Sequence, residues 1–209
     1  AGMLALFMLI AGGWGGMINA SYQMNTLVHN TQWVTGHFHL IFGGTTVIMY
    51  LATAYYLWPK LTGRRIASRS MAVMQLWLWA IGMLILTMPW HVLGLLGQPR
   101  RISSAPYDSP LVAHWDPHEL AMIVGGAVLM FSALLFVLNL LLSHASKKLD
   151  QVNDDDWAVA VYPPLNVPKS MNGFALWNGI VAVWMVVAYG IPIVQLLILD
   201  APGSVPWGY

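Results

Sequence analysis

Long runs almost free of charge alternate with short polar segments along the whole 209-residue chain. One of these runs extends from Thr31 to Trp58 without a single Asp, Glu, Lys or Arg. A helix needs about 20 apolar residues to cross the hydrocarbon core of a bilayer, and each run reaches that length. We therefore predict about five membrane-spanning helices, at residues 1–19, 32–58, 71–97, 118–143 and 172–199.

Composition supports the same class of protein. Apolar residues make up 58% of the chain and charged residues only 8%, against roughly 25% charged in a soluble domain. We therefore expect an all-α integral membrane protein whose helices form part of a larger bundle. No cysteine is present, so disulfides, iron–sulfur clusters and thiolate ligands are excluded. No basic stripe suggests a nucleic acid partner, and the lipid bilayer is the expected surrounding.

The polar joints between the spans carry the cations and predict an orientation. If the spans alternate in direction, one side of the membrane receives seven cations: Lys60, Arg64, Arg65, Arg69, Lys147, Lys148 and Lys169. The other side receives only Arg100 and Arg101. The positive-inside rule assigns the first side to the cytoplasm. The two arginines on the outer side then need an explanation of their own.

Two histidines, His37 and His39, are separated by Phe38 inside the second predicted span. On a helix, positions i and i+2 point about 200° apart, so the two imidazoles cannot bind one metal ion together. Two metal centres on opposite sides of one helix suit this arrangement, and planar iron cofactors with one axial histidine each would fit. The alternatives are buried histidines that hydrogen-bond across a bundle, or a proton relay in a membrane transporter.

The arginine pair has two interpretations. Arg100 and Arg101 either anchor the chain to lipid headgroups, or bind carboxylates through their planar guanidinium groups. His29 precedes His37 by eight residues, which is about 12 Å along the axis if the helix begins that early. We expect His29, Trp33 and the two arginines to converge on the propionate edge of a haem that stands upright on His37.

These residues resemble a known family. The run from His29 to Leu40, which continues to Trp58-Pro59-Lys60-Leu61-Thr62-Gly63, is similar to the tenth helix of haem-copper oxygen reductase (cytochrome c oxidase) subunit I. The segment Gly97-Gln98-Pro99-Arg100-Arg101 resembles the propionate-binding loop after the next helix. The resemblance covers residues 1–209 and starts at the ninth helix of the family. It implies the C-terminal transmembrane portion of that subunit, and thus a piece of a longer polypeptide.

The resemblance implies roles for individual residues. His37 would be the proximal ligand of a high-spin haem iron, and His39 an axial ligand of a low-spin haem iron. His29 would lie by the propionates of the high-spin haem, and Arg100 and Arg101 would bind propionates of both haems. None of these residues is expected to act as an acid, a base or a nucleophile.

The same resemblance implies a function for the complete complex. Electrons would pass from the low-spin haem to a high-spin haem and copper centre, where O2 is reduced to water with coupled proton pumping; Phe38, between the ligands, would shorten their path. Copper ligands come from earlier helices, so activity would need the N-terminal part of subunit I and a copper-containing subunit II. Cytochrome c or a small copper protein would donate the electrons. The membrane would be the plasma (inner) membrane of a bacterium or archaeon.

Departures from the family pattern indicate a branch. A-type enzymes usually have Asp where this chain has Asn30, so we predict no magnesium site there. The short loops and the additional last span resemble the B-type branch more closely. Nitric oxide reductases are similar around this helix, but commonly have Gly in place of Phe38 and lack the Pro-Arg-Arg loop. A nitric oxide reductase-like haem subunit, and a non-haem transporter or assembly protein, remain the alternatives.

Overall fold

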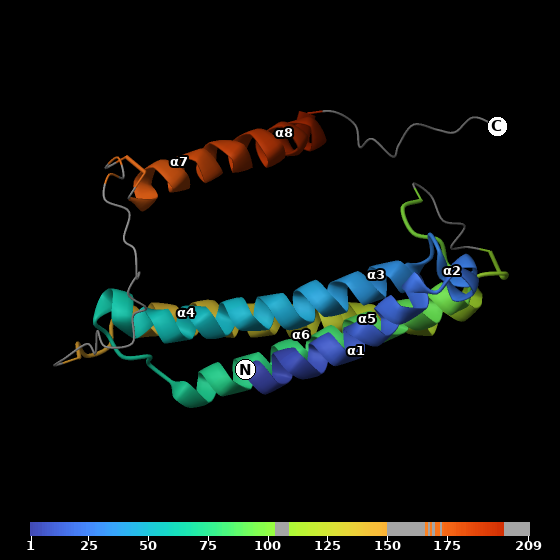
Figure 1. Ribbon diagram of the computed structural model, residues 1–209, viewed down its shortest axis with the longest axis horizontal. Coiled ribbons are helices and arrows are strands. Elements are labelled where there is room, and N and C mark those ends of the chain that lie inside the picture. Colours follow the sequence, from blue (N-terminus) through green and yellow to red (C-terminus); the bar gives the residue numbers. More distant parts are fainter. Residues whose placement is uncertain (103–108, 150–165, 167, 169, 172, 199–209) are drawn as a thin grey trace. The chain divides into compact units, whose positions relative to one another are not determined.

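The structure, a computed structural model, describes residues 1–102, 109–149, 166, 168, 170, 171 and 173–198 (Figure 1). Helices account for all the regular structure of these residues, apart from two isolated β-bridges. The chain divides into two compact units, Ala1–Asp155 and Asp156–Tyr209, which are described separately.

The first unit contains the elements α1 (Gly2–Ala20), α2 (Tyr22–Val28), α3 (Gln32–His39), η1 (Leu40–Thr46), α4 (Val47–Thr62), α5 (Arg69–Leu95), η2 (Ala113–Trp115) and α6 (Asp116–His144). The elements α3, η1 and α4 follow one another without a break and form one long helix, Gln32–Thr62. The middle element η1 is a wide π-helical turn that begins directly after His39. Such turns are rare and often mark functional regions.

The start of the long helix differs from the start assumed for placing His29. Thr31 caps α3, because its Oγ1 accepts a hydrogen bond from the backbone N–H of Trp33 (3.3 Å). His29 therefore lies in the break between α2 and α3, with an extended backbone and an exposed side chain. It does not share the helix of His37, so the expected 12 Å offset along one axis does not apply.

The other helix ends follow local chemistry. The long helix continues past Pro59 to Thr62 because Pro59 lies in its last turn, where the missing N–H costs a single bond. Gly63, at φ 65°, then ends the helix by donating its N–H to the carbonyl of Pro59. Helix α5 ends at Leu95 rather than 97, since Gly97 turns the chain at φ 80°.

Helices α5 and α6 form the most closely packed antiparallel pair of the first unit. Polar side chains join them along their length: Asn139 donates to the carbonyl of Ser68 (2.9 Å), and Gln75 donates to Ser132 (3.0 Å). These groups are buried, and in hydrocarbon a polar group without a partner is costly. The hydrogen bonds therefore fix how the two helices meet.

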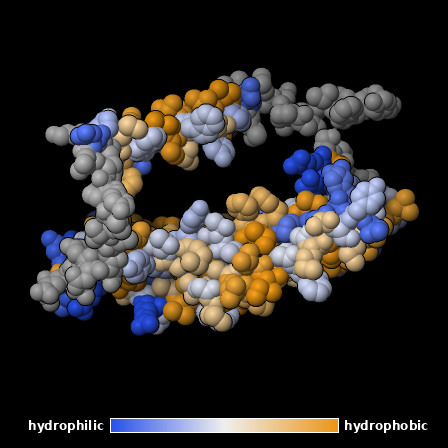
Figure 2. Space-filling view, in the orientation of Figure 1, coloured by the Kyte–Doolittle hydropathy of each residue, from blue (hydrophilic) through white to orange (hydrophobic). Residues whose placement is uncertain are grey.

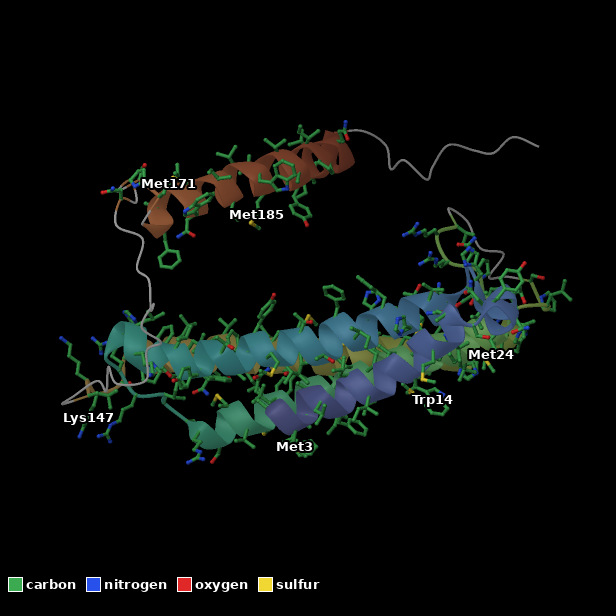
Figure 3. All side chains as sticks on the ribbon, viewed as in Figure 1. Met3, Trp14, Met24, Lys147, Met171 and Met185 are labelled. Carbon is green, nitrogen blue, oxygen red and sulfur yellow. The ribbon has the colours of Figure 1, made fainter. Side chains whose placement is uncertain are left out.

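The surface of the first unit suits a bilayer. Hydrophilic residues gather at the two ends of the bundle and apolar residues cover much of its middle (Figure 2). On α1, Met3, Phe7, Ile10, Trp14 and Met17 are exposed, and Trp14 points away from the bundle (Figure 3). A contiguous apolar face of this kind is expected where a protein meets lipid or other membrane helices.

The cations of the first unit lie largely at one end. The loops after α4 and α6 are joined by an antiparallel bridge between Arg64 and Lys148, and the N–H of Arg65 donates to the carbonyl of Lys147 (3.3 Å). Lys147 marks this end of the bundle in Figure 3. Lys169, which the orientation argument also used, lies outside the described residues.

The second unit contains α7 (Phe174–Met185), η3 (Val186–Gly190) and α8 (Ile191–Ile198), which follow one another without a break. Within the described residues, five helices are long and apolar enough to cross a membrane: Gly2–Ala20, Gln32–Thr62, Arg69–Leu95, Ala113–His144 and Phe174–Gln195. The predicted fold class, all-α with about five transmembrane helices, is confirmed.

Candidate functional site

The loop after α5 pairs with the start of α3 and brings the two arginines to the histidine helix. A β-bridge joins Thr31 to Pro99, and the N–H of Arg100 donates to the carbonyl of Asn30 (2.9 Å). Asn30 (φ 59°) and Arg101 (φ 60°) both adopt left-handed backbone conformations. Asn tolerates that region well, whereas Arg does so at a cost. Among the described residues, these are the two non-glycine positions with positive φ, and both lie at the junction that holds the arginine pair.

His37 faces helix α1. Its Nδ1 lies 2.7 Å from the carbonyl oxygen of Gly12. Because a carbonyl only accepts, Nδ1 carries a hydrogen, and in the neutral ring Nε2 then presents the lone pair that ligates a metal. A Cβ atom on Gly16 would lie 2.9 Å from Cε1 and 3.4 Å from Nε2 of His37. The ring of His37 therefore packs closely against α1 at Gly16, where a larger side chain would collide with it.

His39 faces another way and has the same chemical form. Its Nδ1 lies 2.9 Å from the carbonyl oxygen of Thr35, so its Nε2 also presents a lone pair. No described residue forms a hydrogen bond with Nε2 of either histidine. The ring of Trp90 lies beside that of His39, with centroids 4.8 Å apart. Thus the two imidazoles leave α3 toward different surroundings, as the i, i+2 spacing predicts.

His39 opens into a hollow of about 530 Å³ that we call the arginine hollow. It is lined by Gln32, Val34, Thr35, Phe38, His39, Trp90, Arg100 and Arg101. Its volume lies within the range of about 300–1,000 Å³ that is typical of ligand and cofactor sites. One imidazole, two guanidinium groups and two aromatic rings therefore border the same space.

The guanidinium group of Arg100 has an unsatisfied hydrogen-bond donor at this hollow. Its Nε is buried and has no hydrogen-bond partner among the described residues. A buried guanidinium N–H without an acceptor costs free energy, and a carboxylate is the acceptor that fits the planar fork. Arg101 is exposed, at the rim of the hollow.

Trp33 lies on the α1 side of α3. It is 8% exposed, and its Nε1 donates to the carbonyl of Gly15 (3.3 Å). Its ring meets that of His91 edge to face, with centroids 4.8 Å apart. His91 hydrogen-bonds the carbonyl of Thr87 within its own helix (2.8 Å). The structure thus brings Arg100, Arg101, Phe38 and His39 together around the arginine hollow, whereas Trp33 packs with His91 on the α1 side. His29 does not line the hollow, although its neighbour Asn30 accepts a hydrogen bond from the N–H of Arg100.

Sequence reasoning missed several residues of this arrangement. Trp90, Thr35 and the glycines of α1 received no role, although they contact the two imidazoles. The spacing of Gly12, Gly15 and Gly16 was an available signal, because small residues three to four apart mark close helix approach in membranes. The contact of Trp90 had no comparable signal.

The fold and the site define a class: a multi-pass membrane protein in which one helix directs two imidazoles toward different surroundings. Comparison with known proteins identifies the family. Residues 1–128 match the family described as cytochrome c and quinol oxidase polypeptide I. Because the match covers more than half of the chain, the chain belongs to this family.

The relatives agree. Cytochrome c oxidase subunit 1 of Thermus thermophilus is 35% identical over 205 residues, covering 94% of this chain and 36% of the relative. The subunit 1 of a Synechocystis species is 36% identical over 138 residues, covering 66% of this chain and 23% of the relative. The chain thus spans about a third or less of the length of these relatives.

A solved structure supports the same arrangement of helices. A haem-copper terminal oxidase dimer, determined by cryo-electron microscopy, matches with a TM-score of 0.63 and 31% identity. The match covers 71% of this chain and 26% of that chain. Membership of this family implies haem and copper in general, and a membrane complex with further subunits.

The residues present fit haem. In their neutral form, the two imidazoles with unpartnered Nε2 atoms are suitable axial ligands, and the buried Nε of Arg100 is a suitable partner for a propionate. The arginine hollow leaves space beside His39, whereas His37 packs against the backbone of Gly16. Among the described residues, no group of three or more His, Asp or Glu side chains could hold a metal ion such as copper.

Proposed function

We propose that this chain is the haem-binding, C-terminal transmembrane part of subunit I of a cytochrome c oxidase. In this proposal it acts together with the N-terminal part of subunit I, which would supply the copper ligands, and with a copper-containing subunit II. Cytochrome c or a small copper protein delivers the electrons. The complex lies in the plasma membrane of a bacterium or archaeon.

One observation carries the proposal: His37 and His39 face different surroundings, each with Nδ1 on a backbone carbonyl and Nε2 without a partner among the described residues. Hydrogen bonding at Nδ1 fixes the tautomer and the ring orientation, and raises the basicity of Nε2. That arrangement suits two metals held one per histidine. We assign His37 to the high-spin haem and His39 to the low-spin haem.

When bound, the haems supply electron transfer and, with copper, the reduction of one O2 by four electrons and four protons to two water molecules. The residues of this chain orient the haems and adjust their reduction potentials. The arginines hold carboxylates in the arginine hollow, and their charge favours the reduced state of a nearby iron. Phe38, half exposed beside both ligands, offers an apolar contact that excludes water between the two cofactors. His29 and Trp33 are proposed to lie near the propionates of the high-spin haem.

Within the family we propose the B-type branch. Asn30 replaces the Asp that A-type enzymes usually carry next to the histidine at position 29. In this chain, the backbone of Asn30 has a structural task, since its carbonyl accepts the N–H of Arg100. The additional last span, α7 to α8, supports the same assignment.

The test is to replace each ligand in the assembled complex. His39→Ala should abolish the low-spin haem absorption and leave the high-spin haem in place, because each iron depends on its own imidazole. His37→Ala should remove the high-spin haem and stop O2 uptake. Visible spectra of oxidised and reduced complexes measure both effects.

His144→Ala provides the matched control, because His144 is exposed at the far end of α6. It should keep both haems. Loss of both haems to the same extent from either ligand variant, in a complex that still assembles, would contradict one iron per histidine. A wild-type complex without haem absorption would contradict the function itself.

A further inference from the structure

Two adjacent residues of α5 lie by the two proposed ligands: the ring of Trp90 contacts that of His39, and His91 packs with His37 against Gly15. Helix α5 crosses α3 closely at this level. A Cβ atom on Gly36 would lie 3.0 Å from the carbonyl oxygen of Thr87, and one on Gly94 would overlap the backbone of Trp33. With so little space between the helix backbones, neighbouring residues of α5 pass on either flank of α3.

His91 passes on the flank that faces α1. A Cβ atom on Gly15 would lie 3.2 Å from Nε2 of His91, and 3.3 and 3.4 Å from Cβ and Nδ1 of His37. Both imidazoles therefore rest against the same glycine backbone. The ring of His91 is held in turn by the carbonyl of Thr87 and by the edge-to-face contact with Trp33.

Trp90 passes on the flank that faces the arginine hollow. Its ring lies 4.8 Å from that of His39, at an interplanar angle of 52°. It lines the hollow together with Phe38 and the two arginines. Phe38 also meets the imidazole of His39 edge to face, with ring centroids 5.6 Å apart, so two aromatic rings contact this imidazole.

We infer that Trp90 and His91 are the positioning residues of the two haem ligands, Trp90 for His39 and His91 for His37. This inference rests on the proposed function of the same site. Neither residue ligates a metal in this arrangement. Each limits the rotation of one imidazole about its χ angles, and so keeps the Nδ1 hydrogen bond to Thr35 or Gly12 short.

The two positioning residues should affect different haems, His91 the high-spin haem and Trp90 the low-spin haem. If His91 is removed, the packing that it shares with His37 at Gly15 loosens, the hydrogen bond of His37 to Gly12 weakens, and Nε2 would be a weaker donor to iron. When Trp90 is removed, the plane of the His39 imidazole is free to turn. The two effects are separable because the two histidines lie on different flanks of α3.

The test uses His91→Leu and Trp90→Leu in the assembled oxidase complex. His91→Leu should move the iron–histidine stretching band of the ferrous high-spin haem to lower frequency in resonance Raman spectra. It should leave the electron paramagnetic resonance signal of the ferric low-spin haem unchanged. Trp90→Leu should shift the electron paramagnetic resonance signal of the low-spin haem, because this signal depends on the angle between the planes of its two axial ligands. It should leave the iron–histidine stretching band of the high-spin haem unchanged.

His91→Phe and Trp90→Phe keep an aromatic ring in each place and should give smaller shifts with the same selectivity. If a Leu variant does not assemble, the corresponding Phe variant is measured in its place. Val92→Ala is the matched control, since Val92 is an exposed neighbour on the same helix and should change neither signal.

A substitution that shifts both signals, or Leu and Phe variants that shift neither, would overturn the inference. Failure of the proposed function gives another result: the wild-type complex lacks one or both haem signals, or His37→Ala and His39→Ala leave both in place. The two failures are therefore distinguishable.

Discussion

At the scale of single residues, the site is organised by where polar atoms find partners in an apolar setting. The Nδ1 atoms of His37 and His39 have backbone carbonyls, and the indole N–H of Trp33 has the carbonyl of Gly15. Arg100 differs, because its buried Nε lacks a partner among the described residues. Arg101 beside it holds a left-handed backbone at φ 60°, which costs about 1–3 kcal/mol for such a residue. The proposed haem propionate would give the Nε of Arg100 its missing acceptor.

Replacing Arg100 tests this account. Arg100→Gln removes a positive charge beside a haem, so the midpoint potential of the nearer haem should fall by tens of millivolts, given about 59 mV per tenfold change in a one-electron equilibrium. Arg100→Lys keeps the charge but loses the planar fork, and should give a smaller fall. Redox titration of the assembled complex measures both.

Arg65→Gln serves as the control, because Arg65 is exposed at the opposite end of the bundle. It should leave both potentials unchanged. If Arg100→Gln also leaves them unchanged in well-assembled complexes, Arg100 only anchors the chain to headgroups.

At the scale of elements, glycine decides where the helices come closest. A Cβ atom on Gly125 of α6 would lie 2.5 Å from the backbone nitrogen of Leu86 on α5, and one on Gly82 of α5 would lie 2.9 Å from Leu129. In membranes, helix association depends on such close packing and on hydrogen bonds between helices rather than on the hydrophobic effect. The polar pairs between Ser68 and Asn139 and between Gln75 and Ser132 act along the same line of contact.

Two adjacent glycines of α6 allow a matched experiment. Gly125→Ala should destabilise the packing of α5 on α6 by roughly 1–3 kcal/mol, because the backbone of Leu86 cannot move aside cheaply. At Gly126, a Cβ atom would meet nothing within 4 Å among the described residues. Gly126→Ala should therefore be close to neutral. Loss of haem absorption on heating the assembled complex reports the difference, and equal losses for the two variants would refute the packing argument.

At the scale of the whole molecule, the first unit has the character of a part of a larger membrane assembly. Its helices expose large apolar side chains, among them Trp14 at 69% and Phe38 at 51%. The arginine hollow is lined by α3, α5 and the loop after α5, and its one imidazole would supply a single axial ligand in the proposed function. A low-spin haem needs a second axial ligand, and the copper centre needs its own set.

This incompleteness leads to a prediction for the isolated chain. Expressed alone in membranes, it should bind no stoichiometric copper and take up no O2. Co-expression with the N-terminal helices of subunit I and with subunit II should restore both. Copper analysis and oxygen electrode measurements decide the matter, and O2 uptake by the chain alone would be incompatible with the proposed function.

Much of the fold could be predicted because its signals are local. Charge-free runs of sufficient length indicated the five membrane helices, and the i, i+2 spacing indicated that His37 and His39 diverge. The position of His29 was predicted less well: eight residues of separation imply an axial distance only if the helix is continuous, and the Thr31 cap interrupts it. A cap depends on one side chain and one backbone N–H, which hydropathy does not register.

The sequence by itself determined the class of membrane protein, the number of its apolar helices and the divergence of the two imidazoles. These follow from composition and from the helical period, which is a property of neighbouring residues. Only the tertiary structure decided that Trp90 meets His39, that His91 and His37 share Gly15, and that the arginines reach His39 rather than Trp33. Such pairings depend on the axial offset between helices, which glycine contacts and interhelical hydrogen bonds set across long stretches of chain.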